Sequence, residues 1–243
     1  MADVARQMAQ TTNDLDGAAE RAFEKALAQT AAMKPETEKA AAVNEIALRR
    51  VQAACDVAGF LLSVPETVKE AKAPLERAGK DAEKITDLTL QAKALASYAR
   101  VLAELEGDTP AVQAVVARVA KAAETLAEPA KEKLLAFALR TRVETSAATA
   151  KFIALRGEKA KAKQAFLAAL KASNGIVTKS EDPGTRSEVA KHRTEALGEL
   201  ARYMRAAGDK QAAAKVFQLA VKTAEPAQAP RALSAMVLAL RTN

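Results

Sequence analysis

The sequence predicts an all-α protein made of stacked helix pairs, and three observations lead to this class. Alanine, the strongest helix former, supplies 61 of the 243 residues. Clusters of Val, Ile, Thr and aromatic residues of the kind that form strands are absent, and the nine glycines and eight prolines fall mostly between periodic runs. The aromatic content is only 3%, without Trp. Such a thin core suits a row of neighbouring helices better than one large globular core.

The stretch 194–226 is the clearest element and predicts a helical hairpin. Apolar residues recur at i, i+3, i+4 and i+7 in two runs, as on one face of a helix. They are Leu197, Leu200, Ala201 and Met204 in the first run, and Ala213, Val216, Phe217 and Ala220 in the second. Between the runs, Gly208 suits the left-handed conformation that ends a helix. Asp209 is placed to cap the helix that follows.

Comparison of the rest of the sequence with this hairpin indicates a repeat of about 50 residues. The pattern small-x3-large-x2-small is centred on Phe23, Leu75, Val116, Phe166 and Phe217. Glycines 59, 107, 157 and 208, spaced by 48, 50 and 51 residues, are expected to end the first helix of each pair. About nine or ten helices follow from this count.

In the first half of the chain, proline sets most of the expected boundaries. After a short lead, we expect a helix from about 14 to 30, broken at Pro35, and a long helix from about 36 to 60. Pro65 suits the first turn of the next helix. Pro74 lies inside that run and predicts a kink or a restart.

In the second half, we expect a first helix over 87–106, and Thr109 and Pro110 form the start of its partner. A long helix follows Pro129 to about Arg156, with 158–173 as its partner. The polar stretch Asn174–Glu188 is expected to be an exposed, mobile loop, either a connector or a recognition loop.

A short last helix is expected after Pro226. It would cover the open end of the stack, a normal need of such arrays. Its apolar face is made of Leu233, Met236, Val237 and Leu240.

These residues resemble a tetratricopeptide repeat. The features that carry the resemblance are Ala201, Gly208-Asp209, Ala213-x3-Phe217-x2-Ala220 and Pro226, with a second set in Ala150, Gly157, Ala162, Phe166 and Ala169. The units depart from the family in length, because family units have about 34 residues. Leu197 stands where the family has a large aromatic residue, Tyr203 lies one position from the usual tyrosine, and Thr149 replaces a usual leucine.

The resemblance implies a right-handed α-solenoid of stacked antiparallel helix pairs, with residues 1–243 as one domain and a subdivision near residue 129 left open. In the family, the first helices line a concave surface that receives peptides or partner segments. Carried over unit by unit, this places Arg49, Arg50, Tyr98, Lys151, Arg202 and Arg205 on that surface. Arg offers a planar fork of donors to carboxylate or phosphate, and Tyr adds apolar area with a polar tip. The other interpretation is that they are ordinary solvated residues.

The composition excludes several kinds of metal, disulfide and nucleotide-binding site. His192 is the only histidine and Cys55 the only cysteine, so a multi-His metal site, a zinc site with paired cysteines and an internal disulfide are excluded. Cys55 lies on an apolar face and is expected to be buried, with a reactive thiol as the alternative. GxxxxGK[ST] and GxGxxG phosphate loops are absent. We therefore predict no catalytic, cofactor-binding or metal site, and no cofactor.

The net charge of +7 comes from 37 basic and 30 acidic residues. It fits either a solubilising surface or an anionic partner. We predict a non-enzymatic scaffold that binds a protein or peptide in its concave groove. The alternative is a nucleic-acid-binding solenoid, against which the few aromatic stacking platforms count. An enzyme would need polar side chains clustered in a pocket, and no sequence motif indicates such a cluster. Self-association through Ala-rich faces is a further alternative.

The sequence gives little about the compartment. No apolar run approaches the roughly 18–20 residues that span a bilayer. Residues 1–13 lack the apolar core of a signal peptide. The cytoplasm is slightly favoured, and an exported mature form remains an alternative.

Overall fold

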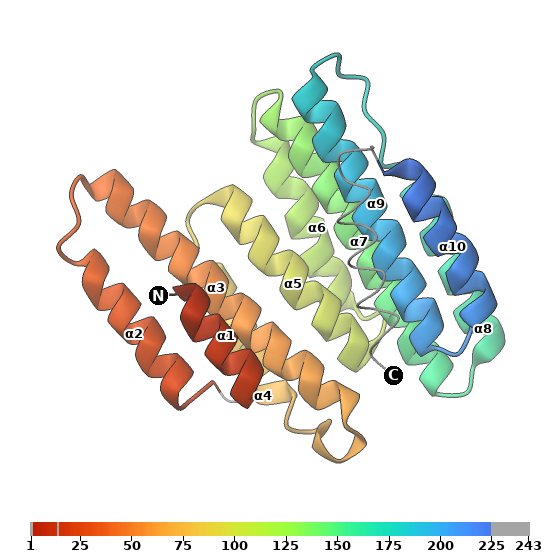
Figure 1. The fold of residues 1–243 in the computed structure, drawn as a ribbon, viewed down its shortest axis with the longest axis horizontal. Helices are drawn as coiled ribbons and strands as arrows, with labels where there is room; N and C mark the ends of the chain where they lie inside the picture. The colour runs from red at the N-terminus through yellow and green to blue at the C-terminus, as the bar shows by residue number, and fades with distance from the viewer. Residues whose placement is uncertain (1, 14, 225–243) are drawn as a thin grey trace. The chain divides into compact units, whose positions relative to one another are not determined.

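The computed structural model describes residues 2–13 and 15–224, and over these ranges the protein is helical (Figure 1). It has ten α-helices and one 3-10 turn, and no strand within the described ranges, which confirms the all-α prediction. The elements are α1 (Ala2–Thr12), α2 (Ala18–Thr30), α3 (Glu36–Ser63), η1 (Pro65–Thr67), α4 (Lys72–Glu83), α5 (Leu88–Glu106), α6 (Pro110–Glu124), α7 (Ala130–Leu155), α8 (Lys159–Ser173), α9 (Pro183–Ala206) and α10 (Lys210–Thr223).

The contacts divide the chain into two compact units, with the boundary between Leu105 and Glu106. The sequence left a subdivision open near residue 129, but α6 packs on α7 and belongs with the second unit. Unit 1 and unit 2 are described one after the other.

Unit 1 is organised around α3, its longest helix, against which α1, α2 and α4 pack. The core is small because alanine fills much of it, and three larger side chains from three helices lie at its centre. They are Phe23, Val51 and Leu75, all buried. Two of them, Phe23 and Leu75, are the large residues of the predicted repeat pattern.

Unit 2 contains two helix hairpins, α7–α8 and α9–α10, with α7 and α9 packed against each other. The hairpin predicted over 194–226 is present in its described part, and Phe166 of the preceding hairpin is buried as expected. Phe217 is half-buried. The helix expected after Pro226 lies outside the described residues.

The turns that end α5, α7 and α9 use the predicted glycines. Gly107, Gly157 and Gly208 have φ values of 77°, 86° and 91°. At the last of these turns, the Asp209 N–H donates to the Met204 carbonyl at 3.0 Å, which closes the helix end with an i-to-i−5 bond. The prediction for Gly59 was wrong: this residue lies within α3, which continues to Ser63.

The two helix starts with predicted caps, those of α6 and α10, show the expected capping chemistry. The Asp209 carboxylate accepts the Ala212 N–H at 3.1 Å, and Thr109 accepts the Val112 N–H at 3.3 Å. In the first half of the chain, α4 begins two residues before Pro74, so that this proline lies in a first turn and marks a restart. The helix expected from about residue 14 to 30 is α2, which begins at Ala18 after Gly17, and the short lead before it forms a separate helix, α1.

The polar loop is shorter than predicted. It ends at Asp182 because the Asp182 carboxylate accepts the Thr185 N–H at 2.7 Å and Pro183 opens α9, so 183–188 is helical. The loop is also anchored: Ile176 is 1% exposed, and Glu132 of α7 accepts the Lys179 N–H at 3.2 Å.

Cys55 is 2% exposed in α3, which confirms the buried interpretation. Burial raises the pKa of its thiol to about 12, because the thiolate is disfavoured away from water; Arg100 and Arg6 oppose this shift only in part. The thiol is therefore protonated and shielded in the folded protein.

Gly208→Ala and Gly198→Ala form a matched pair that isolates the backbone conformation. A Cβ added at either glycine meets no atom within 4 Å, but only Gly208 has positive φ. We expect Gly208→Ala to lower the free energy of unfolding by about 1 kcal/mol or more. Gly198→Ala, within α9, should raise it by about 0.5–1 kcal/mol. Urea titration measures both, and equal effects would contradict the role given to the turn.

The native thiol of Cys55 should resist iodoacetamide at pH 8, because both the raised pKa and the loss of access suppress the thiolate. Mass spectrometry should find alkylation only after denaturant is added. Rapid native labelling would restore the reactive-thiol interpretation.

Candidate partner-binding surfaces

In unit 2, α7 and α9 run parallel in a fixed register. Three side-chain contacts join the two helices: Phe137 to His192, Arg140 to Glu195 and Lys151 to Tyr203. The residue numbers in these pairs differ by 55, 55 and 52. A nearly constant difference means that both helices advance in the same direction, as the corresponding helices of two successive hairpins do.

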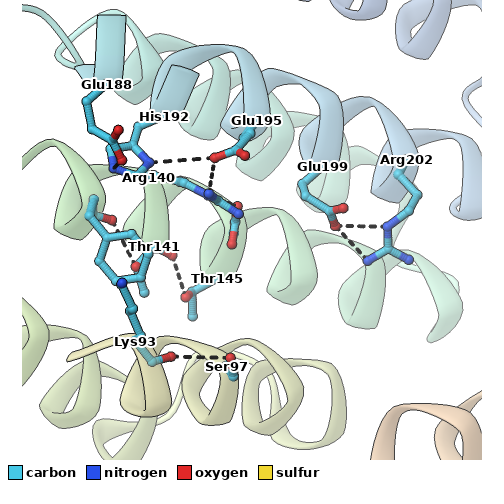
Figure 2. Close-up of polar contacts among 12 residues, drawn as sticks. Lys93, Ser97, Arg140, Thr141, Thr145, Glu188, His192, Glu195, Glu199 and Arg202 are labelled. Carbon is cyan, nitrogen blue, oxygen red and sulfur yellow. Dashed lines mark hydrogen bonds and ion pairs between the residues drawn. The ribbon is translucent and has the colours of Figure 1, made fainter. Parts of the chain in front are cut away.

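A network of ion pairs lies along this contact (Figure 2). The Arg140 guanidinium donates to Glu144 Oε1 at 2.5 Å on its own helix, and to Glu195 across the interface. Figure 2 shows Glu195 between Arg140 and His192, whose Nδ1 lies 3.6 Å from the carboxylate. Glu188 is 3.6 Å from the other ring nitrogen of His192. The network joins residues from both helices and fixes how they pair.

The pKa values of Arg140 and Glu195 reflect their pairing in this network. Burial lowers the pKa of Arg140, but the carboxylates of Glu144 and Glu195 outweigh burial and hold the pKa above its ordinary value. Burial raises the pKa of Glu195, but His192 and Arg140 outweigh it and hold the pKa below the ordinary value. Both side chains therefore keep their charges, and the network is a structural contact rather than a poised acid–base pair.

The sequence did not identify this network. In the sequence His192 stands beside Lys191 and Arg193, a setting typical of a basic, solvated helix start. In the structure the His192 side chain is 9% exposed and lies edge-on against Phe137, with ring centroids 5.5 Å apart. The spacing of Glu188, His192 and Glu195 on one helix face was the available signal.

Two predicted binding residues, Lys151 and Arg202, lie at the far end of the same α7–α9 contact. The Arg202 guanidinium lies 4.3 Å from the Tyr203 ring centroid, and Lys151 Nζ lies 5.8 Å from it. Arg202 also donates to Glu199 at 2.9 Å. Arg205 is half-buried and forms no hydrogen bond or ion pair with residues of the described ranges. Positive charge therefore exceeds negative charge here, although the face as a whole is mixed.

Arg49 belongs to unit 1, where it pairs with two carboxylates. Its Nε is 2.9 Å from Asp3 and its Nη2 is 2.8 Å from Glu45. The contact to Asp3 joins α3 to α1.

Arg50 is more deeply engaged. Arg50 donates to Glu20 of α2, and Arg77 of α4 donates to the same carboxylate. Arg50 also lies 3.5 Å from Asp81. One carboxylate thus ties three helices of unit 1 together, which gives Arg50 a structural role.

Tyr98 of α5 packs against α4. A Cβ added at Gly79 would lie 3.1 Å from the Tyr98 ring, so the absent side chain of Gly79 makes room for the tyrosine. The ring is half-buried by this contact.

A groove lies on another side of α7, and it was not predicted from the sequence. It has a volume of about 670 Å³ and is bounded by α6, α7 and α8. Its lining is mostly apolar and rich in alanine, with a few polar side chains along α7. The small residues on the outer faces of α6 and α8 were the only available signal.

Comparison with protein-family models, with curated proteins and with solved structures finds no match to this chain. The described helices include none with both the length and the apolar character to cross a membrane. Over residues 2–13 and 15–224, no three His, Cys, Asp or Glu side chains are placed to hold a metal ion.

Removing Arg140 should take one guanidinium away from two carboxylates, Glu195 and Glu144, of which Glu144 is only 9% exposed. We expect Arg140→Met to lower the free energy of unfolding by about 3 kcal/mol, because both carboxylates lose a charged donor at a largely buried contact. Adding Glu144→Gln should recover part of this loss, which a double-mutant cycle by urea unfolding measures. Strictly additive effects would show that the two side chains do not interact.

Proposed function

We propose that the chain is a non-enzymatic scaffold of tetratricopeptide-like helix pairs, stacked as a right-handed solenoid, that binds a partner protein or peptide on the face of its first helices. The observation that carries the proposal is the parallel register of α7 and α9. Repeat arrays require corresponding helices of successive units to lie side by side in the same direction, because each unit contacts only its neighbours.

Within this proposal, the binding residues of unit 2 are Lys151, Arg202 and Arg205. They combine an excess of positive charge with the edge of a buried aromatic ring, a surface suited to an acidic segment of a partner. Arg49 and Arg50 contribute less, because a partner would have to displace the carboxylates that already hold them.

The interleaved glutamates favour a protein partner over a nucleic acid. Glu188, Glu195 and Glu199 lie on the same helix as Arg202, so a phosphate backbone lying along α9 would meet carboxylates as well as basic groups.

The test is a double charge reversal, Arg202→Glu with Arg205→Glu, compared with Lys215→Glu and Lys222→Glu on α10. Both variants change the net charge equally, but only the first alters the proposed face. Affinity capture from the source cell followed by quantitative mass spectrometry should show partners reduced about tenfold or more by the first variant and retained by the second.

Circular dichroism should be unchanged in both variants. Equal recovery of every partner by the two variants would contradict the proposed face, and capture of nucleic acid that is lost with added salt would favour the alternative function.

A further inference from the structure

The groove of unit 2 has the dimensions of a helix-binding site. Its floor is α7, from Leu135 to Thr149, a length of about 21 Å at 1.5 Å per residue. One wall is α6, through Val112, Val116 and Ala120, and the other is α8, through Ala165 and Ala168. Four helical turns of mostly apolar floor between two helical walls match the length of a short amphipathic helix.

The groove lies on the opposite side of α7 from the contact with α9. At 3.6 residues per turn, Arg140, Glu144 and Lys151 fall on one side of the helix, whereas Leu135, Arg142 and Thr149 fall about 180° away. The groove is therefore a second surface, distinct from the face of the proposed function.

Two charged residues give the groove a defined polarity. Arg142 lies halfway along the floor, is exposed, and forms no hydrogen bond or ion pair within the described part of the chain. Asp108 lies at the end where α6 begins, where it accepts a bond from Gln113 at 3.1 Å. An occupant with an acidic side chain opposite Arg142, and a basic or neutral one near Asp108, would match both charges.

An extended peptide fits this groove less well than a helix. The walls are helices, whose backbone groups are already paired, so a strand lying between them would find no backbone partners. A helix satisfies its own backbone and needs only an apolar face toward Leu135, Leu139 and Val116.

The charges also argue against the chain's own last residues as the occupant. The stretch 226–243 contains Arg231 and Arg241 and no acidic side chain, so none of its side chains can form an ion pair with Arg142.

We propose that the groove between α6 and α8 binds an amphipathic helix of a partner protein, with an Asp or Glu on its apolar face directed at Arg142. This partner is separate from the one taken by the α7–α9 face, because the two surfaces lie on opposite sides of α7.

The test is selection from a displayed library of amphipathic helices of about 16 residues, long enough to span the floor, against the full chain. One central position of the apolar face is left free. Selected binders should carry Asp or Glu there. In fluorescence anisotropy, the best binder should lose about tenfold in affinity for Arg142→Glu, and its Lys counterpart should gain on the same variant.

Ala168→Trp should abolish binding by filling the groove, whereas Ala114→Trp, at an exposed site of α6 outside the groove, should not. Thermal unfolding of both variants establishes that they fold. Failure to select any binder, selection without an acidic preference, or binding unaffected by Ala168→Trp would each overturn the proposal.

Cysteine labelling tests whether something already fills the groove. Cys55 is buried and should not react with the labelling reagent, so Ala168→Cys and Ala114→Cys report separately on the groove and on the control site. Equal labelling rates without peptide, and protection of Ala168→Cys alone by the selected peptide, are expected. Protection of Ala168→Cys without peptide would assign the groove to this chain or to a second copy and overturn the partner helix.

Discussion

The side-by-side contact of α7 and α9 is the constraint on which unit 2 depends. Ala147 and Ala148 of α7 and Ala196 of α9 are buried, and small residues let two helices approach closely. Small side chains give little preference for one register over another, because each buries little area. The register is therefore set by the larger polar and aromatic contacts at the edge, above all by Arg140 and Glu195.

The same requirement explains why several residues expected to bind a partner are engaged within the protein. Because the core has few large side chains, charged pairs formed by the arginines help to fix how the helices pack against one another. Arg50 joins three helices through Glu20, and Arg202 is held by Glu199. A basic residue on a helix of this chain is therefore as much a packing element as a surface feature.

Local features of the fold could be predicted from the sequence, but long-range ones could not. Periodicity and capping residues fixed most helices, since the turn at Gly208 needs only its own neighbours to form. The prediction that Gly59 ends a helix was wrong, because a glycine inside a helical run ends the helix only if the chain must turn there. The ion pairs of Arg50 and Arg140 were missed because their carboxylates lie 30 and 55 residues away.

The groove was missed for a different reason, which lies in α7 itself. This helix has no single apolar face, because it contacts α6, α8 and α9 around its circumference. From its sequence alone, Leu135 and Leu139 look like any other buried residues of a central helix. Only the spacing of α6 and α8 leaves them uncovered, and spacing between two helices that pack on a third is not encoded in any one of them. A helix surrounded on three sides and open on the fourth can thus hold its neighbours in register with one face and offer another to a partner.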